Sequence, residues 1–163
     1  MRQKAAYFGV FTALAMILSY IEAQLPFFYG IPGVKLGLAN SMSLTVMYLM
    51  GPAAAYAVSG IRIILTGFLF GNMFSILYSL AGGLLSLTVM LLMRKSRCFS
   101  IVGISMAGGL THNIGQLAVA VCVVENLNLM YYLPVLLISG TVTGLVIGIL
   151  SREILKRMPQ GRM

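Results

Sequence analysis

Charged residues are so sparse in this chain that they divide it into apolar runs of membrane length. Only 9% of its 163 residues are charged, and 60% are hydrophobic, with a mean hydropathy of +0.98. Ordinary soluble domains carry about a quarter charged residues, and a chain of this size cannot bury so much apolar surface in one water-soluble core. The pattern therefore predicts an integral membrane protein and excludes a soluble globular enzyme.

Six apolar runs are expected to form transmembrane helices, each of which needs about 20 residues. They cover approximately residues 5–22, 36–50, 53–70, 73–93, 99–124 and 130–150. The short polar stretches between them leave no room for a soluble domain. The expected architecture is a single all-α polytopic membrane domain, a bundle of six helices.

The positive charges predict the orientation of the bundle. With six spans both termini lie on the same side of the membrane, and cytoplasmic loops carry an excess of Lys and Arg. Placing the termini in the cytoplasm puts nine of the 11 Lys and Arg residues there. We therefore expect a multi-pass protein of the cell membrane with cytoplasmic termini. The two exceptions, Lys35 and Arg62, fall on the outer side or within the membrane.

The residues that are missing restrict the chemistry. The three acidic residues are all Glu, so no Asp-rich magnesium-binding motif is present, and no GxxxxGK[ST] phosphate loop occurs. One His, two Cys and three Glu are too few for a convincing metal site. The sequence therefore predicts no catalytic residues, no metal and no cofactor, and it indicates that the chain is not itself an enzyme.

Arg62 lies near the middle of the third expected span. A charge at this depth costs between about 3 and more than 10 kcal/mol unless it faces protein or water. Two interpretations remain open. Arg62 either binds an anion in a substrate cavity or forms a structural pair, for which Glu22 is a candidate.

Two further polar clusters also have both a ligand-binding and a structural interpretation. His112, Asn113 and Gln116 are spaced to share one helix face, which either lines a binding site or forms hydrogen bonds between helices. Lys35 follows a Pro-Gly turn. Either Lys35 and the N-terminus of the next helix hold an anion, or the turn is an ordinary hairpin and the lysine side chain reaches the lipid head groups.

Small residues recur at intervals of four on the first and last expected spans. Ala5, Gly9 and Ala13 form one stripe, and Gly140, Gly144 and Gly148 form two overlapping GxxxG motifs. Such stripes let helices approach closely in lipid. Most serve packing within a bundle, but the first stripe is also a candidate docking surface for a partner subunit.

Several strings across nearly the whole chain resemble one known family. They are IPGVKLGLAN (31–40), LFGNMFSILYSLAGG (69–83), HNIGQ (112–116) and YYLPVLLISG (131–140). By these strings the chain resembles the family labelled heptaprenyl diphosphate synthase component I, also called the Gx transporter family. That family is similar in topology to the substrate-binding S components of energy-coupling factor (ECF) transporters, which are membrane proteins of six helices.

The resemblance implies two functions. The first, which the sequence favours, is an S-component-like subunit that captures a small, partly apolar anion for uptake, such as an isoprenoid or quinone precursor or a vitamin-like molecule. Its partners would be a transmembrane coupling subunit and separate ATPases. The alternative is a non-catalytic membrane accessory subunit of a heptaprenyl diphosphate synthase in quinone biosynthesis, because such a synthase binds magnesium diphosphate through Asp residues that this chain lacks.

For the S-component-like function, the candidate substrate-binding residues are the polar residues of the outer half of the bundle. We expect them to include Lys35, Arg62, Asn72, His112, Asn113 and Gln116. Phe27, Phe28 and Tyr29 would form an aromatic lid over them. The stripe of Ala5, Gly9 and Ala13 would dock on the coupling subunit, since S components often dock through small residues of their first helix.

Overall fold

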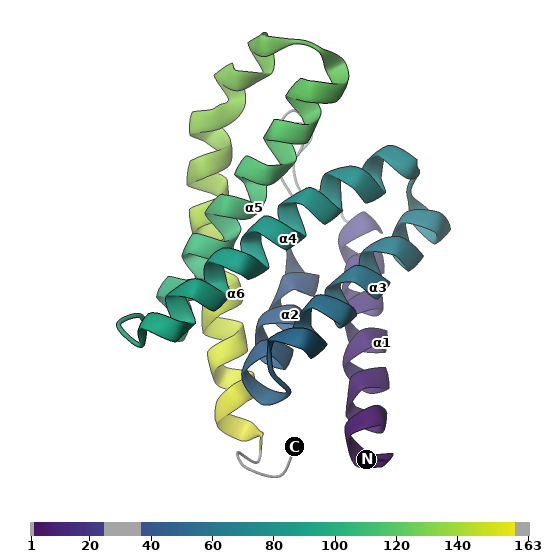
Figure 1. The fold of residues 1–163 in the computed structure, drawn as a ribbon, viewed down its shortest axis with the longest axis vertical. Helices are drawn as coiled ribbons and strands as arrows, with labels where there is room; N and C mark the ends of the chain where they lie inside the picture. The colour runs from purple at the N-terminus through teal and green to yellow at the C-terminus, as the bar shows by residue number, and fades with distance from the viewer. Residues whose placement is uncertain (1, 25–36, 159–163) are drawn as a thin grey trace.

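The computed structural model describes residues 2–24 and 37–158, and within them it contains six α-helices and one short 3₁₀ helix. In chain order the elements are α1 (Arg2–Gln24), α2 (Leu38–Leu49), α3 (Pro52–Phe70), α4 (Met73–Ser96), α5 (Ile101–Val124), η1 (Leu127–Tyr132) and α6 (Leu133–Arg157). The expected bundle of six helices is confirmed. The beginning of α1 and the end of α6 lie at the same end of the bundle (Figure 1).

Five of the described helical segments are long and apolar enough to cross a membrane, and α2 is the exception. Their outward faces carry apolar side chains that remain largely exposed in the isolated chain, such as Phe68, Leu92 and Ile138, which are between 60% and 70% exposed. A belt of this kind is what lipid tails would cover. The chain is therefore a multi-pass membrane protein.

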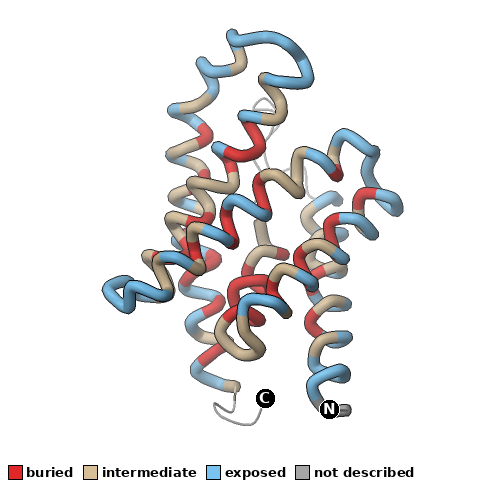
Figure 2. The backbone as a smooth tube through the Cα atoms, in the orientation of Figure 1, coloured by how far each residue is buried: buried red, intermediate tan, exposed pale blue. Residues whose placement is uncertain are grey.

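The second expected span is present as a helix, but α2 has only 12 residues. At 1.5 Å per residue it is about 18 Å long, short of the roughly 30 Å hydrocarbon layer. Most of its residues are buried among α1, α3 and α6 (Figure 2). This position explains its sequence, because Asn40, Ser41, Ser43 and Thr45 would be costly on a helix that faced lipid.

The hydrophobic core surrounds the second half of α2. Leu44, Val46 and Met47 pack there with residues from α1, α3, α4 and α5. The Arg94 guanidinium closes this end of the core. It donates a hydrogen bond to the backbone carbonyl of Met47, and it lies over the Tyr48 ring, 4.6 Å from the ring centroid. Arg94 thereby satisfies a carbonyl that the end of α2 leaves without an intrahelical partner.

Glycines bring the backbones of α5 and α6 into direct contact. A Cβ atom on Gly144 would lie 2.7 Å from the Met106 Cα atom, and one on Gly148 would lie 2.8 Å from the Val102 Cα atom. The GxxxG motifs of α6 therefore serve packing within the bundle. Gly60 of α3 is different, because a Cβ atom there would meet nothing within 4 Å.

This difference predicts opposite effects for two identical substitutions. Gly144→Ala should destabilise the bundle by about 1–3 kcal/mol, because the added methyl group separates α5 from α6. Gly60→Ala should leave stability unchanged or raise it by about 0.5–1 kcal/mol through its better helix propensity. Thermal unfolding in detergent measures both. Equal effects of the two substitutions would contradict close α5–α6 packing.

Candidate functional site

A polar pocket lies between the helices, in the half of the bundle that is farther from the two termini. Its cavity volume is about 180 Å³. It is bounded by the last turns of α1, the start of α2, the second half of α3, the start of α4 and the middle parts of α5 and α6. The polar lining residues are Ser19, Glu22, Asn40, Arg62, Thr66, Ser75, Ser79, His112, Asn113, Gln116 and Thr143.

Arg62 is the central charged residue of this pocket. It is only 9% exposed, and its guanidinium donates hydrogen bonds to Ser19 Oγ (3.1 Å) and to Asn40 Oδ1 (3.2 Å). Its buried Nε atom has no hydrogen-bond partner among the described residues. Both acceptors are neutral, so they orient the guanidinium through α1 and α2 without neutralising its charge.

Glu22 lies in the same pocket but not in a contact ion pair with Arg62. The salt bridges that join two described residues within 4.0 Å connect Glu153 to Arg152 and to Lys156, and none joins Glu22 to Arg62. Burial disfavours the positive charge of Arg62, and the Coulomb attraction of Glu22 offsets part of that cost. Of the two interpretations of Arg62, the direct pair with Glu22 is absent, and the guanidinium lines a cavity.

The Glu22 carboxylate also connects two helices. It accepts a hydrogen bond from the backbone N–H of Gly37, the residue that precedes α2. Gly37 has φ 68°, in the left-handed region that glycine adopts without strain. Glu22 therefore fixes the start of α2, and with it Asn40, relative to the last turn of α1.

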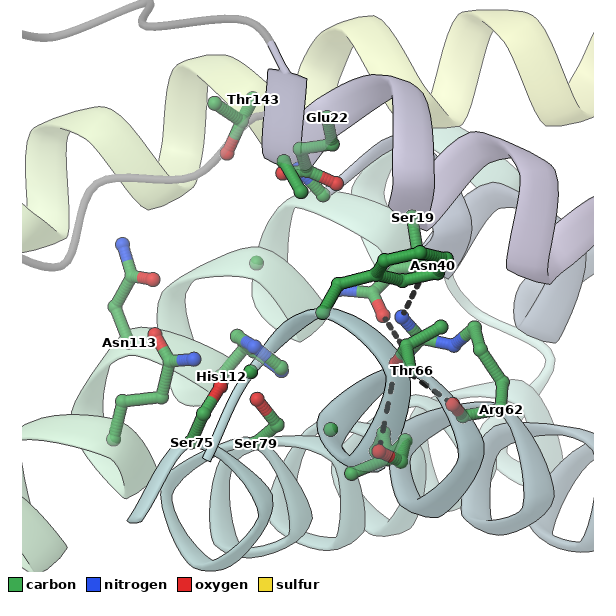
Figure 3. Close-up of a pocket in the computed structure, with 18 of the residues that line it drawn as sticks. Ser19, Glu22, Asn40, Arg62, Thr66, Ser75, Ser79, His112, Asn113 and Thr143 are labelled. Atoms are coloured by element: carbon green, nitrogen blue, oxygen red, sulfur yellow. Dashed lines mark hydrogen bonds between the residues drawn. The ribbon is translucent and has the colours of Figure 1, made fainter. Parts of the chain in front are cut away.

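His112 and Gln116 lie across the pocket from Arg62, on the face of α5 that packs against α4. In Figure 3 His112, Asn113 and Ser75 lie on one side of the pocket, and Arg62 and Asn40 lie on the other. A Cβ atom on Gly82 of α4 would lie 2.8 Å from Gln116 Cγ, so only glycine leaves space for this side chain. The Gln116 residue is 2% exposed. No described residue forms a hydrogen bond with its amide group.

Asn113 has a different environment on the same helix. Its amide nitrogen donates to the backbone carbonyl of Leu136 (2.7 Å) and lies 3.4 Å from Ser139 Oγ. These hydrogen bonds join α5 to α6. For Asn113 they match one of the two interpretations of this cluster, hydrogen bonding between helices. Asn113 also lines the pocket.

The structure thus brings together four of the six residues predicted to bind substrate: Arg62, His112, Asn113 and Gln116. Asn72 does not line the pocket. It is exposed and caps α4 by accepting a hydrogen bond from the Ser75 backbone N–H (2.8 Å). Lys35 and the predicted lid residues Phe27, Phe28 and Tyr29 lie outside the described residues.

Several lining residues were not predicted from the sequence. Ser75 and Ser79 are one turn apart on α4, a spacing that places both on one face and could have identified them. Ser19 and Asn40 gave no comparable signal, because a single small polar residue is common in membrane helices. Phe70 also lines the pocket, and its ring packs against Tyr20 with 4.9 Å between the ring centroids.

The predicted docking stripe faces outward. Ala5, Gly9 and Ala13 are all exposed, and a Cβ atom on Gly9 would meet nothing within 4 Å. These residues therefore do not pack against the other described helices of the chain.

The fold and the pocket together define a polytopic α-helical membrane protein with a buried polar cavity. The profile of the family described as heptaprenyl diphosphate synthase component I matches residues 11–154. The chain belongs to this family, as its resemblance predicted. Searches of curated proteins and of solved structures gave no match.

The different environments of Asn113 and Gln116 lead to a paired prediction. Asn113→Leu should destabilise the bundle by about 0.5–2 kcal/mol, because it removes hydrogen bonds between α5 and α6. Gln116→Leu should not destabilise it, because no bond to a described residue is lost. Thermal unfolding in detergent measures both variants. A larger loss of stability for Gln116→Leu would contradict these roles.

Proposed function

We propose that this chain is a non-catalytic membrane subunit that binds a small, partly apolar anion in the pocket around Arg62. One observation carries the proposal: a buried guanidinium, oriented by two neutral acceptors, faces a cavity, and its Nε atom has no partner in the described part of the chain. A charge held inside a membrane protein in this way usually marks a substrate or ion site.

The cavity volume restricts the ligand. A cavity of about 150 Å³ accepts benzene, so one of about 180 Å³ takes a molecule of roughly one ring with a small substituent. A long polyprenyl chain does not fit. The suitable ligands are compact anions such as an aromatic quinone precursor, a short isoprenoid precursor or a vitamin-like acid. Gly67, Ile63 and Phe70 supply the apolar part of the lining.

The family description favours one biological setting for this binding site, the accessory subunit of a heptaprenyl diphosphate synthase. The words "component I" imply a second component. Since this chain contains no Asp, the second component would provide the diphosphate and magnesium chemistry. The membrane subunit would then hold a small precursor or regulator next to the bilayer that receives the lipid product.

A second setting, uptake as an S-component-like subunit, is favoured by the position of the pocket. If the termini are cytoplasmic, as the distribution of cations indicates, the pocket lies in the outer half of the bundle. Substrate would enter from outside, and movement against a coupling subunit driven by separate ATPases would release it inside. A cysteine placed at Ser96 should then resist an impermeant thiol reagent applied to intact cells.

Both settings require a partner, and the exposed stripe of Ala5, Gly9 and Ala13 is the proposed contact surface. Small residues allow close approach of a partner helix in lipid. The described helices do not cover them.

The partner is identified by coexpression with either a prenyl diphosphate synthase subunit or an ECF coupling subunit of the same genome. The chain should copurify with one of them, and Gly9→Leu should reduce this recovery at least about tenfold, because the leucine prevents close approach. Gly60→Leu, the same change at another glycine where an added Cβ atom would meet nothing within 4 Å, should not reduce it. If both variants reduce copurification, or if neither does, the stripe is rejected as the contact surface.

The anion site is tested at Arg62. With benzoate as a compact probe, Arg62→Ala should weaken binding by about 1.5–3 kcal/mol, the scale of a charge-assisted hydrogen bond. Arg62→Lys should restore only part of this loss, since lysine lacks the planar fork. Isothermal titration calorimetry of the purified protein measures the affinities. Lys95→Ala removes an exposed cation of α4 and should leave benzoate binding unchanged. Absence of benzoate binding in the wild type would contradict the proposed site.

A further inference from the structure

The wall of the pocket opposite Arg62 carries hydrogen-bonding groups that the fold itself does not use. Gln116 of α5 is almost completely buried and lines the pocket, yet its amide group forms no hydrogen bond with a described residue. Ser75 and Ser79 of α4 also line the pocket, and their hydroxyl groups form no hydrogen bond within the described ranges. A buried amide without a partner is costly, so this wall calls for one.

The packing around Gln116 makes room for its side chain without supplying that partner. A Cβ atom on Gly82 of α4 would lie 2.8 Å from Gln116 Cγ, and one on Gly115 would lie 3.0 Å from the Ala81 carbonyl oxygen. The stem of Gln116 is thus held between two backbones in close contact, and its amide group is left for the pocket. Asn113, on the same helix, instead uses its amide nitrogen to bond the Leu136 carbonyl of α6.

A bound ligand changes the hydrogen bonding of this amide group. When no ligand is bound, water can satisfy Gln116. A molecule of one ring fills most of a cavity of about 180 Å³ and displaces that water. The ligand must then supply the partner, or the amide group stays buried without one. A hydroxyl group suits this position, because it both donates and accepts, as the amide group does.

The partner that suits this wall is neutral. Among the described lining residues Arg62 supplies the guanidinium, and it lies on the opposite side of the pocket (Figure 3). Gln116, Ser75 and Ser79 are uncharged, so they match a hydroxyl group better than a second anionic group, which would need its own cation within the membrane.

We propose that the pocket selects a compact hydroxy acid, a monoanion whose carboxylate binds Arg62 and whose hydroxyl group binds Gln116. The apolar body of the ligand lies between them, against the apolar lining residues Ile63, Gly67 and Phe70. Arg62 gives affinity for compact anions in general, and Gln116 determines which of them binds best. This inference rests on the proposed anion site and adds its specificity.

Calorimetry of the purified protein with matched ring acids tests this selection. The probes are 3- and 4-hydroxybenzoate and 3- and 4-methylbenzoate, which are all monoanions at about pH 7. At one ring position or both, the wild type should bind the hydroxy acid at least about tenfold more tightly than the methyl acid, because only the hydroxyl group replaces the water that Gln116 loses. In Gln116→Leu this ratio should fall to about one or below, since leucine favours the methyl group.

Two control variants separate Gln116 from general effects. Asn128→Leu removes an exposed amide group of η1, outside the pocket, and should keep the preference for the hydroxy acid. Arg62→Ala should weaken the hydroxy and methyl acids by similar factors and so keep their ratio, because it acts on the carboxylate that both share.

Each contrary result identifies a different error. Equal binding of the hydroxy and methyl acids by the wild type at both positions would overturn the selection and leave the anion site intact. A preference that persists in Gln116→Leu would overturn the role of Gln116. No binding of any of the four probes would reject the anion site itself.

Discussion

The buried guanidinium of Arg62 is the constraint on which the half of this bundle farther from the termini depends. Within a bilayer a charged group needs protein partners or water, because lipid offers no hydrogen bonds. Its partners here are Ser19 on α1 and Asn40 on α2, so the one side chain links three helices. Asn40 can serve because α2 is held in the interior by Glu22 at its start and by Arg94 at its end.

The helices that surround the pocket are packed in two different ways. In α4, α5 and α6, glycines place backbone against backbone, as at Gly115 and Gly144. In α1 and α3, Gly9 and Gly60 have open space around them. Near Arg62 the close contact is with a side chain, because a Cβ atom on Gly67 of α3 would lie 2.1 Å from Ile76 Cγ1 of α4. Near Gln116 it is with backbone, because a Cβ atom on Gly115 would lie 3.0 Å from the Ala81 carbonyl oxygen.

Much of the fold could be predicted from the sequence, because sparse charges and long apolar runs define membrane helices directly. The convergence of Arg62, His112 and Gln116 on one pocket could also be predicted, because polar groups inside the membrane carry a large free-energy cost unless they face protein partners or water. The short, central position of α2 did not follow, because hydropathy measures apolar content and not which neighbours surround a helix. Ser19 and Asn40 were missed for a related reason: their role comes from the three-dimensional position of one arginine. No local pattern in the sequence encodes that position.

The family description and the pocket become compatible once chemistry and binding are assigned to different subunits. A chain without Asp lacks the usual ligands for magnesium diphosphate, yet its membrane interior maintains a costly arginine beside a cavity. Hydrogen bonds alone do not offset that cost, since among the described residues the guanidinium contacts neutral acceptors, leaves Nε without a partner and forms no salt bridge with Glu22. In the proposed function, an anion that enters the pocket supplies the partner that Nε lacks among the described residues, whether the bound molecule is then transported or presented to an enzyme. The binding step is therefore the part of the proposal that the two settings share, and the proposal assigns Arg62 to that step in both.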